Sequence, residues 1–361
     1  VFKVVHDNVT SRPIEVRCDC AAERLITDAS NTDASNNVVG VQFRANGAPL
    51  RVQARGGVIL ACGGFEGAPE IQKQFWQLQP VLSAASPGNT GDGIRMAVSV
   101  GADLWHMWHF HGAYGFRHPD PGYNGAIRMK RLPDWTPGDE PTNVEMSWIT
   151  VDRHGKRFSN EYVPYAQDTG WRDMDHLNTA TQTFDRIPAC IITDDAGRQI
   201  YPLGQFVYND RHAVPYDWSD DNLREIENGI LESAPTIEKL AIKLDLDPKT
   251  LAETIDSWNQ SCEAGKDGDF GRPPSSMMPI KEPPFVGGRV WPVVSNTQGG
   301  PVHDARQRIL NPFGTPIPGL YGAGECGSIW GFLYMAGGNL SECFIGGEIA
   351  GREAASRIPA D

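Results

Sequence analysis

The chain has 361 residues, of which 40% are hydrophobic and 21% are charged, and this composition is typical of a globular enzyme. A chain of this length can bury a large core, and we expect two domains. The net charge of -13 argues against a nucleic-acid-binding surface, which needs clustered Lys and Arg, and no apolar run is long enough to span a membrane.

The first part of the chain is rich in strand patterns. Residues 14–27 and 38–43 alternate apolar and polar side chains, and the polar loop 29–37 joins them, so we predict a hairpin. Residues 52–62 end in the apolar run VILAC, which is typical of a buried strand. Gly63 and Gly64 then end this strand in a turn.

The next segment, PGNTGDGIRMAVSVGA, predicts a helix directly behind a glycine-containing turn. Either Thr90 or Asp92 can cap the helix, because each side chain offers an oxygen to its free N–H groups. The predicted buried stripe consists of Ile94, Ala97, Val98 and Gly101.

From about residue 105 the sequence becomes aromatic and irregular. The segment SWITVDRHGKRFSNE predicts a second hairpin, with its turn at His154-Gly155.

Two helices are predicted later in the chain, at residues 236–244 and 248–264. Asp247 caps the second helix, and Pro248 takes its first position, where proline is well tolerated. The middle of the chain is therefore predicted to be an α+β region.

Residues 316–339 carry the most informative pattern. The apolar run 319–321 leads into a glycine-rich turn with one acid, Glu325, and Gly337-Gly338 open an amphipathic helix. Glycine allows backbone to approach a ligand closely, and a helix N-terminus offers free N–H groups and a positive dipole end. The segment predicts a site for a large, electron-rich cofactor.

Several motifs resemble those of one family. They are the Gly-Gly-Phe turn after Cys62, T-G-D-G at residues 90–93, GKRFSNE at 155–161 and G-G-N at 337–339. In these motifs the chain resembles the FAD flavoproteins that include fumarate reductase, succinate dehydrogenase and 3-ketosteroid dehydrogenase. The resemblance implies FAD as the cofactor.

The same resemblance implies the domain organisation. We expect an α/β fold in which residues 1–104 and 297–361 form a Rossmann-like FAD-binding domain, with an α+β capping domain inserted at 105–296. The family's N-terminal βαβ unit with its G-x-G-x-x-G motif would precede Val1. We therefore expect an N-terminally shortened copy, or a second chain that supplies this unit.

The resemblance also implies which residues contact FAD. Glu325 is expected to accept hydrogen bonds from the sugar-like hydroxyl groups of the cofactor. The helix N-terminus behind Gly337 is expected to stabilise negative charge on the reduced flavin. The implied cofactor-binding residues are Gly63, Gly64, Thr90, Gly91, Asp92, Gly324, Glu325, Gly338, Asn339 and Leu340.

Three positions depart from the pattern of the fumarate reductases. Tyr165 stands where those enzymes have a proton-donating arginine, and Met335 stands where they have a carboxylate-binding arginine. Asn296 replaces a histidine. A dicarboxylate would lose its bidentate contacts here, so we expect neither fumarate nor succinate as the substrate.

Tyr165 and Tyr334 resemble instead a pair of tyrosines in the ketosteroid dehydrogenase branch. By that resemblance Tyr165 is the general base that removes a proton beside a ketone, and Tyr334 polarises the carbonyl. A tyrosine has an ordinary pKa of about 10, so Tyr165 needs nearby positive charge, for which Arg157 is a candidate. The alternative is that both tyrosines pack with satisfied hydroxyl groups.

The leading hypothesis is an FAD-dependent dehydrogenase of a carbonyl-activated CH–CH bond, in a cyclic ketone or 3-oxosteroid. Its partners would be a small hydrophobic carbonyl substrate and an unknown electron acceptor. One alternative is a flavin-dependent reductase of another activated alkene. Another is a non-catalytic fragment or subunit that lacks FAD.

Two further residue sets bear on the chemistry. His106, His109 and His111 lack a metal-ligand spacing, so we predict no metal site and expect one of them near the substrate. The apolar pocket predicted for the substrate includes Trp105, Trp108, Trp330 and Phe332. Seven cysteines without framework spacing favour reduced thiols and a cytoplasmic location.

Overall fold

The structure is a computed structural model, and it describes residues 2–28, 37–123, 125–132, 145–146, 148–162, 170–205, 216–332 and 337–358. The described helices, including two short 3-10 helices (η), are α1 Phe2–Thr10, α2 Pro69–Phe75, α3 Asp92–Ser99, η1 Gly170–Met174, α5 Asp195–Arg198, α6 Leu223–Glu227, α7 Ile237–Leu244, α8 Pro248–Ala264, η2 Pro274–Ser276 and α9 Gly338–Ser356. The described strands are β1 Cys20–Thr27, β2 Val38–Ala45, β3 Ala48–Gln53, β4 Val58–Leu60, β5 Leu82–Ser83, β6 Leu104–Trp105, β7 Phe110–Arg117, β8 Ala126–Arg128, β9 Ile149–Val151, β10 Leu177–Asn178, β11 Thr183–Phe184, β12 Ala189–Thr193, β13 Glu232–Ala234, β14 Phe285–Thr297, β15 Gly300–Pro301, β16 Arg308–Leu310 and β17 Pro316–Gly322.

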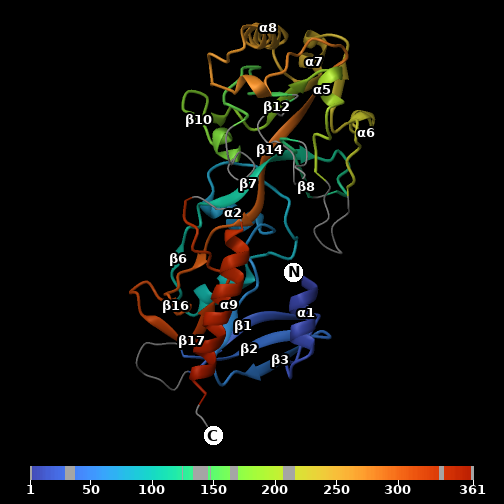
Figure 1. Cartoon of the computed structure of the whole chain (residues 1–361). Helices are drawn as coiled ribbons and strands as arrows, with labels where there is room; N and C mark the ends of the chain where they lie inside the picture. The colour runs from blue at the N-terminus through green and yellow to red at the C-terminus, as the bar shows by residue number, and fades with distance from the viewer. Residues whose placement is uncertain are drawn as a thin grey trace.

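The long strand β14 joins two groups of elements that lie at opposite ends of the molecule (Figure 1). It belongs to a seven-stranded sheet with the order β8-β7-β14-β12-β9, and β13 and β5 also pair with it. Its first half pairs with β12, and its second half pairs with β7. We refer to the group around α7 and α8 as the α8 end and to the group around β4, β17 and α9 as the α9 end.

The α8 end forms as the sequence predicts. Thr236 caps α7 by accepting a hydrogen bond from the Lys239 amide, and Asp247 caps α8 by accepting one from the Thr250 amide at 2.8 Å. Both helices bury one apolar face against β9 and β12, with Trp258 of α8 in the centre of this core. The helix predictions at residues 236–244 and 248–264 are confirmed.

The hairpin at His154-Gly155 is confirmed as a tight turn. The Asp152 amide donates to the Lys156 carbonyl at 2.9 Å, and Gly155 has a φ of 84°. The return arm is a single bridge, Val151 to Arg157, rather than a second strand. The motif therefore places Arg157 beside α8.

The α9 end holds the predicted N-terminal hairpin, since β1 and β2 pair antiparallel. The first strand begins at Cys20 instead of residue 14, because β2 ends at Ala45, which pairs with Cys20 and leaves the preceding residues without a neighbour. Residues 2–10 form the helix α1, which the alternation pattern did not indicate.

The strand predicted at 52–62 is two strands in two sheets. β3 ends at Gln53 and pairs with β2, whereas β4 begins at Val58 and pairs with β17. The chain changes direction at Gly57, whose φ is 121°; a Cβ atom there would lie 2.6 Å from the Gly319 carbonyl oxygen. A close backbone contact explains the break.

The helix after residue 90 exists, but both proposed capping side chains are wrong. The N-cap of α3 is Gly91 in a left-handed conformation, with no side-chain cap. Met96 takes the place expected for Val98 in the buried face, and Val98 is 46% exposed.

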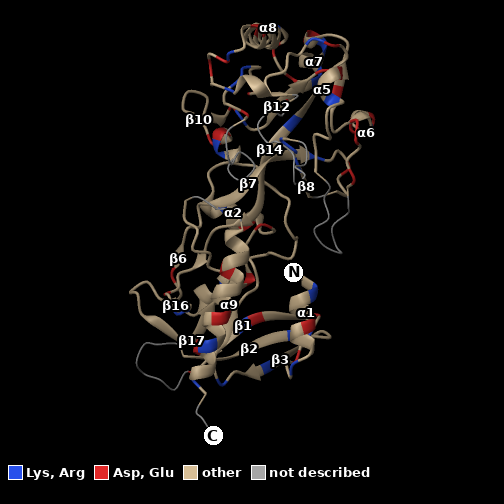
Figure 2. Ribbon diagram, viewed as in Figure 1, with Lys and Arg blue, Asp and Glu red and all other residues tan. Residues whose placement is uncertain are grey.

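Charge is mixed over both ends. Figure 2 shows Lys and Arg residues interspersed with Asp and Glu residues across the described parts of the chain.

Among the helices that the structure describes, none has the length and apolar character needed to cross a membrane. The domain limits at 104/105 and 296/297 stay a prediction, and β14 runs to Thr297.

Candidate functional site

Two parallel strands define one edge of the α9 end. β4 and β17 pair in parallel, with Leu320 opposite Val58 and Gly322 opposite Leu60. The loops that follow both strands therefore leave the sheet at the same edge. In α/β folds, ligands bind at the carboxyl ends of parallel strands. This edge is the candidate site.

The two glycine-rich loops meet there. A Cβ atom on Gly64 would lie 1.9 Å from Thr297 Oγ1 and 3.0 Å from Glu325 Oε1, so only glycine fits. The Gly64 carbonyl accepts a hydrogen bond from the Gly91 amide at 3.0 Å, and Gly63 has a φ of 77°. Residues far apart in the sequence thus form one continuous backbone surface.

A pair of carboxyl groups lies beneath this surface. The Thr297 amide contacts Glu325 Oε1 at 2.8 Å and Glu66 Oε1 at 3.1 Å, and Glu66 is only 1% exposed. Burial, and then the neighbouring Glu66, raise the pKa of Glu325 well above its usual value. The protonated form of Glu325 is therefore favoured, and in that form its carboxyl group can also donate a hydrogen bond.

The turn before α3 lies at the rim of the site. Thr90 Oγ1 donates to Asp92 Oδ2 at 2.9 Å, and the Arg95 guanidinium binds the Thr90 carbonyl at 2.7 Å. These contacts are exposed and hold the turn that presents the Gly91 amide to Gly64. Thr90 and Asp92 therefore orient the turn rather than cap the helix.

The N-terminus of α9 forms the other side of the site. Gly337, with a φ of 81°, is the N-cap, and Gly338 packs under the Trp330 ring. Asn339 Oδ1 is buried and has no hydrogen-bond partner among the described residues, whereas Leu340 is 57% exposed. A helix of 19 residues presents its free N–H groups here.

Gly324 links this helix to the strand edge. It has a φ of 67°, and a Cβ atom on it would lie 2.8 Å from Cys343 Sγ of α9. The close approach brings the Glu325 turn and α9 together. All ten residues predicted to bind the cofactor lie in the loops and helix ends of the α9 end, and their binding roles stay predictions.

A histidine and an arginine that the sequence did not pair lie next to this edge. His109 is fully buried, and its Nδ1 atom accepts a hydrogen bond from Arg172 Nη2 at 3.3 Å. Burial, and then the Arg172 charge, lower the pKa of His109 to about 3, so its imidazole is neutral. Its backbone carbonyl binds the amide of Gln298, the residue after Thr297.

Aromatic rings surround this pair. The Arg172 guanidinium lies 4.7 Å from the centre of the Phe332 ring and 5.6 Å from that of Trp171, and Trp108 lies 6.0 Å from Phe332. Trp108 and Phe332, two of the residues expected to line a substrate pocket, thus lie near a cation, and their role as a lining stays a prediction. Neither Arg172 nor Glu66 carried a sequence signal beyond its position near a glycine or aromatic cluster.

Both proposed catalytic tyrosines, Tyr165 and Tyr334, lie outside the described residues, as does Met335. Arg157, the candidate activator of Tyr165, is bound to Glu161 at 2.8 Å and to Asp267 at 3.1 Å. Two carboxylates therefore compensate its charge, which makes Arg157 unsuitable as that activator.

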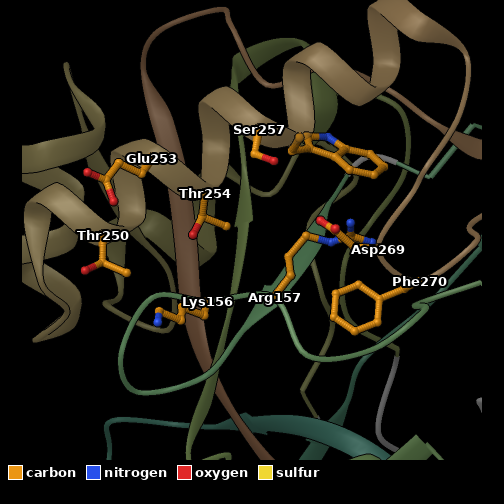
Figure 3. A pocket seen from close by; sticks show the side chains of 9 residues that line it. Lys156, Arg157, Thr250, Glu253, Thr254, Ser257, Asp269 and Phe270 are labelled. Carbon is orange, nitrogen blue, oxygen red and sulfur yellow. The ribbon is translucent and has the colours of Figure 1, made fainter.

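An open pocket of about 450 Å³ lies above this ion cluster, between the 154–157 turn and α8 (Figure 3). Figure 3 shows Thr250, Glu253, Thr254 and Ser257 along the helix side of the pocket. Arg157 lies between the Trp258 and Phe270 rings, at 4.5 and 5.2 Å. The Arg157 cation is already paired with Glu161 and Asp267, so it stabilises the fold beside this pocket and offers no free charge to a ligand.

Among the described residues, no cluster of three or more His, Cys, Asp or Glu side chains could hold a metal ion. Two cysteines do meet at the strand edge. Cys62 follows β4, Cys326 follows Glu325, and a Cβ atom on Gly93 would lie 2.4 and 2.9 Å from their sulfur atoms. The hydrogen bond from Cys326 lowers the pKa of the exposed Cys62 thiol to about 7.

Together these features fit a large flavin-type cofactor. The glycine surface allows close backbone approach, the α9 N-terminus offers N–H donors to an electron-rich ring, and Glu66 and Asn339 carry buried oxygens without partners among the described residues. The class of protein that the fold and site define is a dinucleotide-binding flavoprotein.

Comparison with known proteins agrees with this class. The model of the FAD binding domain family matches residues 1–340, so the chain belongs to that family. This membership identifies FAD as the cofactor for which the site is built.

Known relatives include reductases and dehydrogenases. The chain is 28% identical over 357 residues to the fumarate reductase (cytochrome) of Shewanella frigidimarina, covering 98% of this chain and 54% of that protein. It is 28% identical over 322 residues to the 3-oxosteroid 1-dehydrogenase of Mycobacterium tuberculosis, covering 84% of this chain and 53% of that protein. The chain spans about half the length of these relatives.

A solved structure is also similar. It is the 3-ketosteroid delta1-dehydrogenase from Sterolibacterium denitrificans in complex with 1,4-androstadiene-3,17-dione, with a TM-score of 0.79 and 26% identity. The match covers 98% of this chain and 62% of that chain. The resemblance to the fumarate reductase and ketosteroid dehydrogenase flavoproteins is confirmed.

Proposed function

We propose that the protein is an FAD-dependent oxidoreductase that dehydrogenates a CH–CH bond next to a carbonyl, in a cyclic ketone or 3-oxosteroid. FAD, when bound, accepts a hydride from one of the two carbons. Tyr165 removes a proton from the other carbon, and Tyr334 holds the carbonyl oxygen. The similarity to a 3-oxosteroid 1-dehydrogenase and to a ketosteroid dehydrogenase structure supports this choice.

The observation that carries the choice of substrate is the uncharged Asn296. It lies on β14 opposite His111 of β7, one residue before Thr297, whose amide binds the Glu66–Glu325 pair. A carboxylate at this point of the site would meet an amide where the fumarate reductases, by resemblance, have an imidazole. At this point of the site a carbonyl group fits the amide better than a carboxylate does, because it needs no compensating charge.

The residues of this chain have distinct tasks in the proposed reaction. The α9 N-terminus stabilises negative charge on a bound electron-rich group through its free amides. Glu325 forms hydrogen bonds with the sugar-like hydroxyl groups of the cofactor. Trp108 and Phe332 supply apolar surface for a ring-shaped substrate.

Anaerobic stopped-flow spectroscopy tests the proposal. The FAD-loaded protein is mixed with a 3-oxosteroid or a cyclohexanone, and the loss of the visible absorbance of oxidised flavin is followed. Rapid bleaching with at least one ketone is the expected result. A protein that releases no flavin on denaturation, or a flavin that no ketone reduces, would refute the proposal.

A further inference from the structure

Arg172 is partly buried, and it differs from Arg157 and Arg272, whose side chains are buried, in having no acidic partner among the described residues. Arg157 binds Glu161 and Asp267, and Arg272 lies 3.5 Å from Glu161. No carboxylate among the described residues forms an ion pair with Arg172. Burial alone lowers the pKa of Arg172. A partly buried cation without an anion is a candidate ligand-binding group, because groups with perturbed charge cluster at functional sites.

The hydrogen bonds of Arg172 leave most of its donors unused. Nη2 contacts the neutral His109 ring and donates to the Phe332 carbonyl. The Nε–H is buried and has no acceptor among the described residues, and no described residue accepts from Nη1. Arginine has five N–H donors in a planar fork that matches a carboxylate, so the free part of this fork is available to a ligand.

The position of Arg172 places these donors at the candidate site. Its partner His109 is bound through its carbonyl to Gln298, whose side chain accepts from Ser328 at 3.1 Å. The same Ser328 hydroxyl oxygen lies 3.1 Å from Glu342 Oε2 of α9. A set of buried and partly buried polar contacts thus connects the Arg172–His109 pair with both β14 and the cofactor helix.

The surroundings select the charge and shape of the ligand. Phe332 and Trp171 lie against the guanidinium, and Trp108 extends the apolar wall. The cation favours an anionic group, and the aromatic rings favour a ring-shaped ligand. One unpaired arginine neutralises one negative charge, and His109, being neutral, adds none.

We propose that Arg172 binds a carboxylate of the substrate, so that the substrate is a hydrophobic cyclic ketone carrying one carboxylate group. This inference rests on the proposed function and narrows its substrate class to monoanions. Arg172 is then a specificity-determining residue, and His109 and the Phe332 carbonyl fix the orientation of its guanidinium.

The test compares a ketone acid with its uncharged counterpart. Wild-type, FAD-loaded protein is titrated with 4-oxocyclohexane-1-carboxylate and with its methyl ester. Binding is followed by the fluorescence of the neighbouring tryptophans, and turnover is followed by flavin reduction. We expect the acid to bind roughly 10- to 100-fold more tightly than the ester, as a charged hydrogen-bonded pair provides. Equal affinity for acid and ester overturns the inference without any variant.

Variants then assign the preference to one residue. Arg172→Gln should abolish the preference for the acid and leave ester binding within a few fold, whereas Arg172→Lys should keep part of it. Arg186→Gln is the matched control, because Arg186 also lies over a ring, that of Phe158 at 4.9 Å, and donates to the Asp173 carbonyl. Arg186→Gln should retain the preference in full.

The remaining outcomes separate this inference from the proposed function. If Arg172→Gln slows flavin reduction equally for acid and ester, Arg172 acts on the reacting oxygen and the carboxylate assignment is wrong. If ketones reduce the flavin but acid and ester bind alike, only the inference fails. If the acid binds in an Arg172-dependent way but no ketone reduces the flavin, the proposed dehydrogenation fails and the carboxylate site stands.

Discussion

Arg157 and Arg172 both lie against aromatic rings, yet the two ends of the molecule compensate them differently. At the α8 end, Glu161 and Asp267 hold Arg157, and although burial opposes its charge, these hydrogen bonds raise its pKa. Beside the α9 end, Arg172 has rings, a neutral histidine and a carbonyl, and burial lowers its pKa.

This difference separates polar groups that stabilise the fold from polar groups that are free to bind a ligand. A buried charge whose hydrogen bonds are all made within the protein keeps one conformation in place, and its loss is a loss of stability. A buried polar group with unused donors or acceptors is poised for a ligand. Glu66 and Asn339 share this second condition with Arg172.

The largest effect on stability is expected at Glu161. Its carboxylate binds Arg157 and the Thr150 amide and lies 3.5 Å from Arg272, all in the core. Glu161→Gln should lower the free energy of unfolding by about 3–5 kcal/mol, because it leaves buried cations short of an anion. Urea unfolding followed by tryptophan fluorescence measures the change.

The control for Glu161 is Glu263, which pairs with Lys281 on the exposed surface of the same end. Glu263→Gln should leave the unfolding midpoint unchanged, since exposed ion pairs contribute little. Similar midpoints for both variants would contradict the structural role of the Arg157 cluster.

The largest effect on chemistry is expected at Tyr165. If this tyrosine is the base, Tyr165→Phe should slow flavin reduction on the order of a hundredfold or more with little change in substrate affinity. Tyr334→Phe should do less, because backbone amides near Gly337 can still polarise the carbonyl. Anaerobic stopped-flow with a ketone measures both, and Tyr162→Phe is the control. A Tyr165→Phe variant with near wild-type reduction means that the base lies elsewhere.

Dicarboxylates should be poor substrates. Asn296 and Met335 leave no cation at the two positions where the fumarate reductases, by resemblance, bind carboxylates, and Arg172 can neutralise one charge only. Turnover of fumarate or succinate should be roughly a hundredfold or more below that of the best ketone. Steady-state assays with both acids provide the comparison, and a rate equal to that of the ketone would refute it.

The smallest effect concerns the thiols at the strand edge. Because the Cys326 hydrogen bond lowers the pKa of Cys62 from its ordinary value of 9.0 to about 7, the reactive thiolate is present above about pH 7 and is lost as the pH falls. The rate of Cys62 alkylation should rise through a midpoint near pH 7. Cys326→Ala should move this midpoint upward.

Peptide mass spectrometry after timed alkylation separates the thiols. Cys343 serves as the internal reference, because burial raises its pKa. An identical midpoint for Cys62 in wild type and Cys326→Ala would exclude the hydrogen bond as the cause.

Local signals predicted the fold well where they acted alone. The cap Asp247 predicted one helix start, because a capping side chain and its amide lie within three residues of each other. The strand at 52–62 was predicted as one element, since its break depends on Gly57 meeting Gly319, a contact that no local pattern encodes.

The candidate site shows the same limit. Gly64 and Glu325 could be predicted from glycine-rich turns beside apolar strands. Glu66 could not be paired with Glu325, nor His109 with Arg172, because each pair forms only when distant segments meet. Sequence position suggested Arg157 as a catalytic aid, whereas the fold pairs it with carboxylates.

Strand β14 has a mechanical consequence. It pairs with β12 at the α8 end and carries Thr297 at the other, and its pairing with β7 is irregular between Val294 and Asn296. Pro292 lacks an amide hydrogen, so it donates no backbone hydrogen bond to a neighbouring strand. If the α8 end tilted, β14 would bend most easily just before Thr297. The bend would shift the Thr297 amide and therefore its contacts with Glu66 and Glu325.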